Sequence, residues 1–243
     1  MPATAIVHAG RAQRALALVL LAASLAACGP SGGSYYPLTA GRWWHYAVLT
    51  VVLDDTRRSR FLLQNAGLAR GLDGQVHLQI SQTRSADFLR AEGDGVLRIA
   101  SQHPGMPGPR PDEPPRVVLP QTLAAGSEWQ VRSSLALAES RTFEPRDRII
   151  PRRLPVALTK TIASRDETVE VAAGRFEHCL LVEGVGEASV PADRGNASAT
   201  IRVSVREWYA PDVGLVKLER EETTASTFFK PGRQRWELLD HGG

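Results

Sequence analysis

The sequence is poor in cysteine and lysine and has little net charge. It has 2 cysteines in 243 residues, which excludes the multi-disulfide framework of small secreted domains. Its only lysines are Lys160, Lys217 and Lys230, so arginine carries nearly all of the positive charge. The formal net charge is +3, which gives no electrostatic case for a nucleic-acid partner.

Long apolar runs are also missing. The uncharged apolar stretch at residues 15–27 is shorter than the roughly 20 residues of a membrane span. Arg11 and Arg14 precede it and small residues end it, which is the pattern of a secretory signal peptide. Residues 1–27 are therefore expected to be cleaved. The leader holds two arginines and no acids, so the remaining chain has a formal charge of +1.

The leader ends in Leu25-Ala26-Ala27-Cys28, which resembles the cleavage box of bacterial lipoproteins at all four positions. The resemblance implies that the Cys28 thiol takes a diacylglyceryl group and that the new amine is acylated, giving a durable membrane anchor. Gly29 stands where aspartate would signal inner-membrane retention, which implies an outer-membrane protein facing the periplasm. The alternative is a plain secretory leader with a chance cysteine at its end.

After a flexible tether at residues 28–34, residues 35–243 are expected to form one β domain. Apolar and polar residues alternate at 76–81 and 201–206, which is typical of half-buried antiparallel strands. The sequence therefore predicts a mainly β fold, a curved antiparallel sheet or half-barrel with at most one or two short helices. One helix is possible at 85–92. Further strands are expected at 43–53, 60–68, 96–101, 128–137, 168–172, 176–188, 215–223 and 235–239.

The sequence contains a short internal echo. Leu38-x-x-Gly41-x-x-Trp44 and Leu123-x-x-Gly126-x-x-Trp129 share one spacing, and each precedes an expected strand. Glycine suits the turn, and tryptophan then anchors the strand in the core. The copies indicate either two similar halves of one sheet or simply a common way of starting a strand.

Two segments interrupt the strand pattern. Residues 102–116 are so rich in proline that they are expected to form an exposed loop, since proline cannot donate to a ladder. A polyproline-binding partner is the alternative. Residues 141–155 carry Arg146, Arg148, Arg152 and Arg153. They suit either a solvated loop or one that touches anionic lipid.

The segment Trp208-Tyr209-Ala210-Pro211-Asp212-Val213-Gly214 reads as a strand and a hairpin turn. Pro211 and Asp212 suit the centre of a type I turn, and Gly214 suits a left-handed position. Val205 and Glu207 share one face of the strand while Trp208 takes the other. This change of pattern indicates either a bulge or a strand covered on both faces.

From this segment the chain resembles a largely uncharacterised family of bacterial envelope lipoproteins with the pattern W-Y-A-P-G-V-G-L-V-K. The family's earlier patterns V-x-V-P-A-G-x-F-x-x-C and L-P-x-x-L-x-x-G-x-x-W match residues 169–179 and 119–129. Asp212 replaces the usual glycine and Ala172 the usual proline. The resemblance implies a curved sheet, related to the half-barrels of lipoprotein carriers and receptors, whose concave face holds acyl chains. It implies no catalytic residue.

No pattern indicates catalysis, a cofactor or a metal. The chain lacks G-x-S-x-G, a phosphate-binding glycine loop with lysine, H-E-x-x-H and C-x-x-C. The carboxylates at 54–55 and 166–167 are adjacent at expected turns. Cys179 is expected to be a buried small apolar residue, because its neighbour His178 would point to the opposite face of a strand.

Three functional hypotheses remain. The first is a non-enzymatic envelope lipoprotein that binds a hydrophobic ligand. The second is a structural or assembly subunit that docks to another envelope protein, and the third is a hydrolase with an unrecognised site. In the first, the candidate ligand-lining residues are Trp44, Tyr46, Trp129, Trp208 and Tyr209, although filling the core is the favoured role for any single one of them.

Overall fold

The structure is a computed structural model that describes residues 33–71, 74–137, 139–140, 154–191 and 198–243. Ser34–Gly243 forms a compact unit by itself, and all strands and hydrophobic clusters belong to it. The expected leader and the anchor Cys28 lie outside the described residues. The same is true of Arg146, Arg148, Arg152 and Arg153, so the expectations for this basic segment stay predictions.

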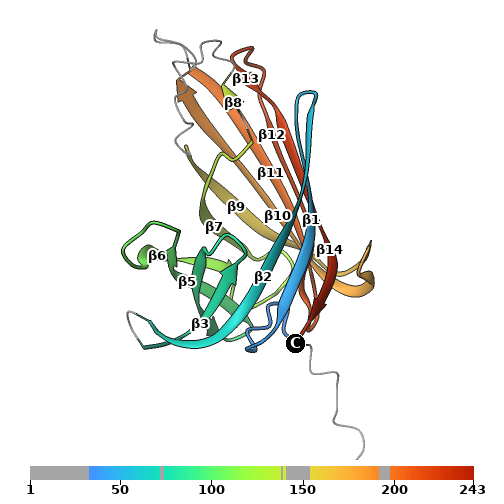
Figure 1. Ribbon diagram of the computed structural model, residues 1–243. Helices are drawn as coiled ribbons and strands as arrows, with labels where there is room; N and C mark the ends of the chain where they lie inside the picture. Colours follow the sequence, from blue (N-terminus) through green and yellow to red (C-terminus); the bar gives the residue numbers. More distant parts are fainter. Residues whose placement is uncertain (1–32, 72–73, 138, 141–153, 192–197) are drawn as a thin grey trace, which may run out of the picture. The chain divides into compact units, whose positions relative to one another are not determined.

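The fold is built from β-strands that follow one another along the chain (Figure 1). The strands are β1 (Trp43–Val52), β2 (Asp55–Gly71), β3 (Gly74–Ser81), β4 (Ala86–Glu92), β5 (Gly95–Gln102), β6 (Arg110–Leu119), β7 (Glu128–Ser134), β8 (Glu139–Ser140), β9 (Pro155–Val171), β10 (Gly174–Pro191), β11 (Ser198–Ala210), β12 (Gly214–Thr223), β13 (Phe229–Lys230) and β14 (Gly232–Gly242).

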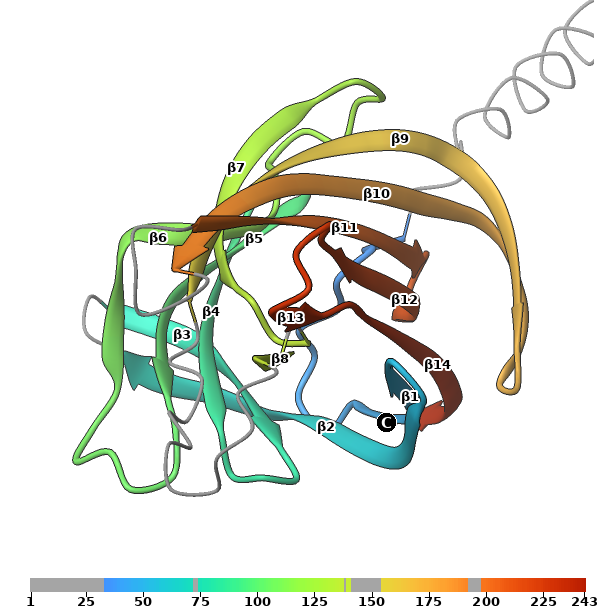
Figure 2. The ribbon, with the colours of Figure 1, turned by 90° about the horizontal axis from the view of Figure 1, so that it is seen from above.

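Twelve of these strands form one antiparallel sheet in the order β6-β5-β4-β3-β2-β1-β14-β12-β11-β10-β9-β7. Within β1–β6 and within β9–β12 each strand pairs with the next along the chain. In addition β7 pairs with β9, β12 with β14, and β14 with β1, which joins the two halves. The sheet curls until it nearly closes (Figure 2). Its two edge strands, β6 and β7, are not joined by a ladder within the described residues. We call this opening the seam.

The mainly β, curved antiparallel prediction is confirmed, and the described residues contain no helix. The helix expected at 85–92 is wrong, because Ala86–Glu92 is strand β4. Its pairing with β5 shifts register between Phe88 and Leu89. This bulge accommodates two consecutive apolar residues, which is why the segment lacks the alternation of a regular strand.

The two copies of the Leu-x-x-Gly-x-x-Trp echo form the same turn. Gly41 has φ 85° and Gly126 has φ 82°. Their N–H groups donate to the carbonyls of Asn65 and Ile162 at 2.9 and 2.8 Å. In each copy the carbonyl of the residue after glycine accepts a hydrogen bond from that same partner. The copies precede β1 and β7, the first strands of the two halves of the sheet, which favours the interpretation as two similar halves.

The Pro-rich segment is only partly a loop. Residues 103–109 connect β5 to β6, but Arg110 begins the edge strand β6, so the loop expected over 102–116 is wrong for its second half. The pairing with β5 passes from Arg98↔Arg116 to Ala100↔Pro111, so the residues of β6 between these pairs form a bulge. An edge strand and a bulge are the places where a sheet tolerates proline.

The expected type I turn is also wrong. Asp212 has φ 59°, whereas both central residues of a type I turn have negative φ. Val213 N–H still donates to the Ala210 carbonyl, so residues 210–213 do form a turn. A left-handed backbone at this position favours glycine. Aspartate tolerates it and adds a bond, since Oδ1 accepts from the Ser34 N–H at 3.1 Å.

The core is divided into four clusters, and the segment before β1 contributes to two of them. Tyr35 packs with Leu180 and Tyr209, while Leu38 packs with Leu89. The cluster that contains Leu158 and Ile201 also holds Phe229 of the small β8–β13 sheet. Within the part of the chain that the structure describes, no helix has the length and apolar character needed to cross a membrane.

Candidate ligand site at the seam

The five aromatic residues expected to line a ligand site lie in or beside the hydrophobic clusters. Trp44, Tyr46 and Trp208 are buried in one cluster, and Tyr209 in another with Trp129 packed against it. None of the five lines any of three cavities in the described part of the chain, one beside β1, β12 and β14, one along β5, β6 and β7, and one at the β2–β3 turn. Their ligand-lining role stays a prediction, while the structure places them as packing residues.

Both explanations offered for the pattern around Trp208 apply. The β11–β12 register shifts between Trp208 and Tyr209, and residues 207–210 are all buried, so the strand is covered on both faces. On the side of Trp208 the cover is partly cationic, because Arg206 and Lys217 lie over its ring at 5.5 and 4.8 Å from the centroid.

The largest of these three cavities lies at the seam. Its volume is about 840 Å³, and it is lined from β5, the following loop, β6, β7 and β9. Small-molecule sites commonly have volumes of roughly 300–1,000 Å³. Apolar contributions come from Met106, Val131 and Ala157 and from the prolines of β6. The opening in the hydrogen-bonded sheet is therefore a space of ligand size.

The lining of the seam cavity is cationic. It contains Arg98, Arg110, Arg116 and Arg132, against Asp112 and Glu113. Four guanidinium groups against two carboxylates leave a formal charge of +2. Guanidinium groups present a planar set of donors that matches carboxylate and phosphate oxygens. The cavity therefore suits a ligand with an anionic group.

Two of these arginines are satisfied by the protein itself. Arg98 donates to both oxygens of Asp112, at 2.7 and 3.1 Å, and lies 3.4 Å from Asp87. Burial opposes the charge of Arg98, but the bonds to Asp112 and the charge of Asp87 outweigh it and raise its pKa. Arg132 donates to the Glu113 carbonyl at 2.8 Å. Arg98 and Arg132 therefore help to hold β6 at the seam.

Arg110 and Arg116 are different. The side chains of both line the cavity without a hydrogen bond or ion pair to another described residue. Burial, and then the nearby charge of Arg98, lower the pKa of Arg116, while Glu207 and Asp87 act in the opposite direction. A half-buried guanidinium without a direct acceptor is costly unless a ligand or water supplies one.

Behind the seam, a buried polar cluster lines the interior. Lys160 Nζ lies 2.6 Å from Glu207 Oε2, and the Tyr209 hydroxyl donates to the same oxygen at 3.0 Å. Tyr36, whose ring lies 6.3 Å from that of Tyr209, donates to Gln79 at 2.8 Å. Burial is the main reason that the pKa of Tyr36 and that of Tyr209 are raised. These phenols stay neutral donors at physiological pH.

Sequence reasoning missed the seam site because its residues are far apart in the chain and look like ordinary surface arginines. The only available signal was the density of arginine around the Pro-rich segment. The described residues include no group of three His, Cys, Asp or Glu side chains placed to share a metal ion. The adjacent pair His178 and Asp166 is exposed, with 2.6 Å between Nδ1 and Oδ1.

Cys179 is buried, as expected from its apolar neighbours. Its exposed fraction is 0%, and its Sγ lies 3.6 Å from the Phe176 carbonyl. Burial, followed by the charge of Glu167, raises the pKa of the thiol to about 11. His178 has φ 55° and points to solvent, where it contacts Asp166 and not the thiol.

We expect Cys179 to react with Ellman's reagent at least roughly 100-fold more slowly in the native chain than in urea, since the reactive thiolate is both scarce and covered. The measurement uses the chain with Cys28→Ser, so that one thiol remains. Ser204→Cys, at an exposed position on β11, provides a reactive control in the same background. Equal rates at the two positions would contradict the burial argument.

Comparisons with known proteins give only remote similarities. No family model matches the chain, and a search among curated proteins gives no match. Among solved structures, a candidate lipoprotein from Parabacteroides distasonis has a TM-score of 0.41 and 14% identity over 87% of this chain and 100% of its own. A candidate exported protein with YmcC-like fold from Bacteroides fragilis has a TM-score of 0.42 and 13% identity over the same shares.

Proposed function

We propose that the chain is a non-enzymatic envelope lipoprotein that binds an anionic amphiphile in the seam cavity. The observation that carries this proposal is the pair Arg110 and Arg116, whose guanidinium groups line a cavity of about 840 Å³ without a protein acceptor. The apolar side chains of the same lining would contact the hydrocarbon part of the ligand. The outer membrane, reached through acylated Cys28, is the proposed location.

The proposed ligand site is the seam cavity and not the five aromatic residues that the sequence suggested. Those five aromatic side chains pack in the core, so they offer no free surface of ligand size. The seam combines an open path, apolar contacts and unpaired donors in one place. A role as an assembly subunit that adds a strand at the seam is not favoured, since the prolines of β6 hinder the addition of another strand.

The first test uses dioctanoyl phosphatidic acid as the probe and dioctanoyl phosphatidylcholine as its zwitterionic control. We expect calorimetry to show binding of phosphatidic acid, and Arg116→Gln to weaken it by roughly 10- to 100-fold, the effect of losing a hydrogen bond to a charged group. Arg110→Gln should weaken it in the same direction.

Arg202→Gln is the matched control, because it removes one exposed arginine from the outer face of β11 with the same change in charge. It should leave the affinity within about twofold. If neither lipid binds at millimolar concentration, or if Arg202→Gln and Arg116→Gln weaken binding equally, then the seam is not the proposed site.

A further inference from the structure

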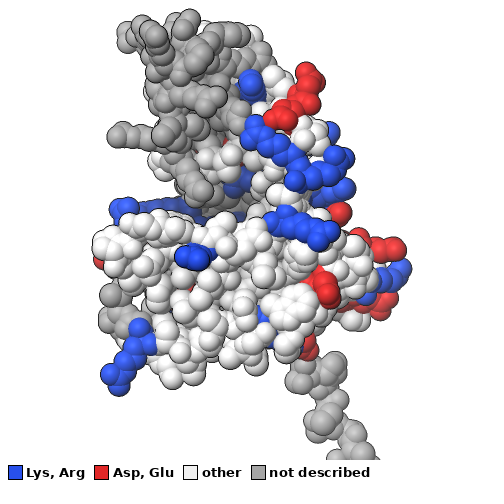
Figure 3. All heavy atoms as spheres, viewed as in Figure 1, with Lys and Arg blue, Asp and Glu red and all other residues white. Residues whose placement is uncertain are grey.

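A second cationic surface lies on the opposite, outer side of the sheet, away from the seam. Figure 3 shows Lys and Arg side chains gathered over β1, β2, β12 and β14. Register places Arg58 of β2 and Arg235 of β14 directly on either side of Leu49. We define the arginine face as Arg58, Arg60, Arg233 and Arg235 together with Ala47, Leu49 and Val51 between them.

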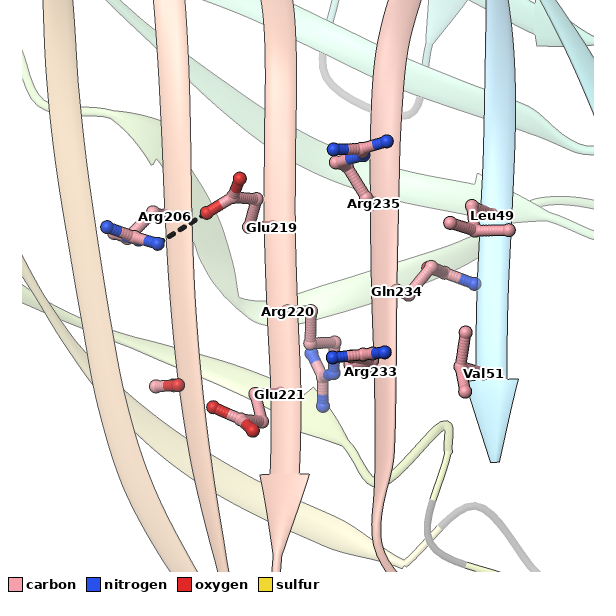
Figure 4. A pocket seen from close by; sticks show the side chains of 10 residues that line it. Leu49, Val51, Arg206, Glu219, Arg220, Glu221, Arg233, Gln234 and Arg235 are labelled. Atoms are coloured by element: carbon pink, nitrogen blue, oxygen red, sulfur yellow. Dashed lines mark hydrogen bonds and ion pairs between the residues drawn. The ribbon is translucent and has the colours of Figure 1, made fainter. Parts of the chain in front are cut away.

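The carboxylates around the arginine face are fewer than its cationic groups, and some of them already form ion pairs. Figure 4 shows Arg233 and Arg235 on β14 beside Leu49 and Val51, while Glu219 is directed to Arg206. Arg235 lies 3.4 Å from Glu237. The side chains of Arg58, Arg60 and Arg233 form no ion pair or hydrogen bond with any residue in the described ranges. With Lys217 and Arg206 the surface carries six cationic groups. Its carboxylates are Glu219, Glu221 and Glu237, so its formal charge is +3.

The arginine face also exposes apolar groups. Leu62, opposite His45 on the same side of β2, is 39% exposed, and Leu49 and Val51 line a cavity of about 480 Å³ with the arginines of β14. Cationic side chains around exposed aliphatic ones are the composition of surfaces that rest at a membrane interface. Phosphate groups of lipids would accept from the arginines while the leucines contact the acyl boundary.

The expected anchor brings such a surface within reach. Five residues lie between Cys28 and Ser34, so the two are at most about 20 Å apart when the chain is extended. The backbone N–H of Ser34 donates to Asp212, in the turn that follows β11. This turn lies beside the start of β1, since Trp44 Nε1 donates to the carbonyl of Val213. The run from Trp44 to Leu49 along β1 is about as long as the tether. A domain that is anchored close to Ser34 can therefore turn the arginine face toward the membrane.

We propose that the arginine face docks flat on the anionic lipid surface of the membrane that holds the anchor. Docking would orient the domain beside the bilayer. The seam, on the other part of the sheet, would then stay open to ligand. The proposal does not depend on the seam site, since different residues carry it.

The test removes the anchor and measures docking alone. The chain from residue 28 with Cys28→Ser is suitable, because Ser34–Gly243 contains every described strand and its own core. It is mixed with vesicles of phosphatidylcholine with or without about 30% phosphatidylglycerol at low ionic strength, and bound protein is measured by sedimentation.

We expect binding only to the anionic vesicles, and its loss in high salt. Each arginine near such a surface contributes about fivefold, so Arg58→Gln/Arg60→Gln/Arg233→Gln should weaken binding by on the order of 100-fold. The matched control is Arg70→Gln/Arg165→Gln/Arg175→Gln, which removes three exposed arginines elsewhere with the same change in net charge. It should retain binding within a few-fold.

Three results would overturn the proposal. They are no preference for anionic vesicles, an equal loss in the two triple variants, or full competition by soluble polyphosphate with no effect of Leu62→Ser. The last result would indicate a phosphate-binding surface without insertion at a membrane. A circular dichroism spectrum equal to that of the parent chain confirms that each variant is folded.

Discussion

Replacing Glu222 with alanine should cost about 3–5 kcal/mol in the free energy of unfolding, because it removes the acceptor of a fully buried polar network. Glu222 is 0% exposed. Its carboxylate accepts from the backbone N–H groups of Ala136 and Leu137, both at 2.9 Å, and from Arg220 Nε at 2.8 Å. These bonds hold the segment after β7 against β12, inside the curled sheet.

The physical reason for so large an effect is that the partners remain when the carboxylate is gone. Two backbone donors and the guanidinium of Arg220 would be left buried without this acceptor, and each unsatisfied group carries a desolvation cost. Arg220 keeps its bonds to the Ser134 carbonyl at 2.7 Å and to the Ser133 hydroxyl at 3.4 Å, so its loss is partial. Leu137, which is buried, would then lose its fixed position.

Urea unfolding followed by tryptophan fluorescence measures the change. Glu221→Ala is the control, because Glu221 is the exposed neighbour on the outer face and should cost within about 0.5 kcal/mol. If Glu222→Ala does not fold, Glu222→Gln keeps an acceptor oxygen and should lose about 1–3 kcal/mol, with faster amide exchange at residues 136 and 137. Equal midpoints for the variants at 221 and 222 would refute this account.

The alternation of apolar and polar residues was enough to predict most strands. The expected strands at 43–53 and 215–223 agree closely with β1 and β12. Alternation works here because one face of the curled sheet is buried and the other is largely solvated, which is the condition for a period of two.

Prediction failed where tertiary contacts override this pattern. Only 168–172 was expected of β9, although the strand begins at Pro155. In its first half Val156, Leu158 and Ile162 alternate as buried residues, but the buried position between 158 and 162 is Lys160. In the sequence, a lysine at an apolar position interrupts the alternation that predicts a strand. The carboxylate that neutralises it lies on another strand, so the sequence gives no sign that the lysine can be buried. The seam arginines were missed because the residues that line the cavity with them lie far apart in the chain.

The Lys160–Glu207 pair is the second site where we expect a large effect. Lys160→Met should cost about 3–5 kcal/mol, because it leaves Glu207 buried without its counter-charge. The side chains of Lys160 and Glu207 are only 7% and 11% exposed, and their charged atoms lie 2.6 Å apart. Gly184, opposite Lys160 in the ladder, leaves room for the lysine stem, since a Cβ there would come within 3.2 Å of its Cγ.

A double-mutant cycle separates the value of the pair from the cost of breaking it. In Lys160→Met/Glu207→Gln no charge is left buried, the amide oxygen still accepts from Tyr209, and methionine fills the space of the stem. We expect this double variant to unfold within about 1 kcal/mol of the parent, although each single variant is strongly destabilised, so the coupling energy should exceed about 2 kcal/mol.

Circular dichroism in a urea series measures all four proteins of the cycle. If the double variant is as unstable as the sum of the singles, the pair itself stabilises the sheet, and the desolvation argument is wrong. If it recovers as expected, the pair adds little net stability. Its value would then lie in fixing the positions of β9 and β11, the two strands that carry Lys160 and Glu207.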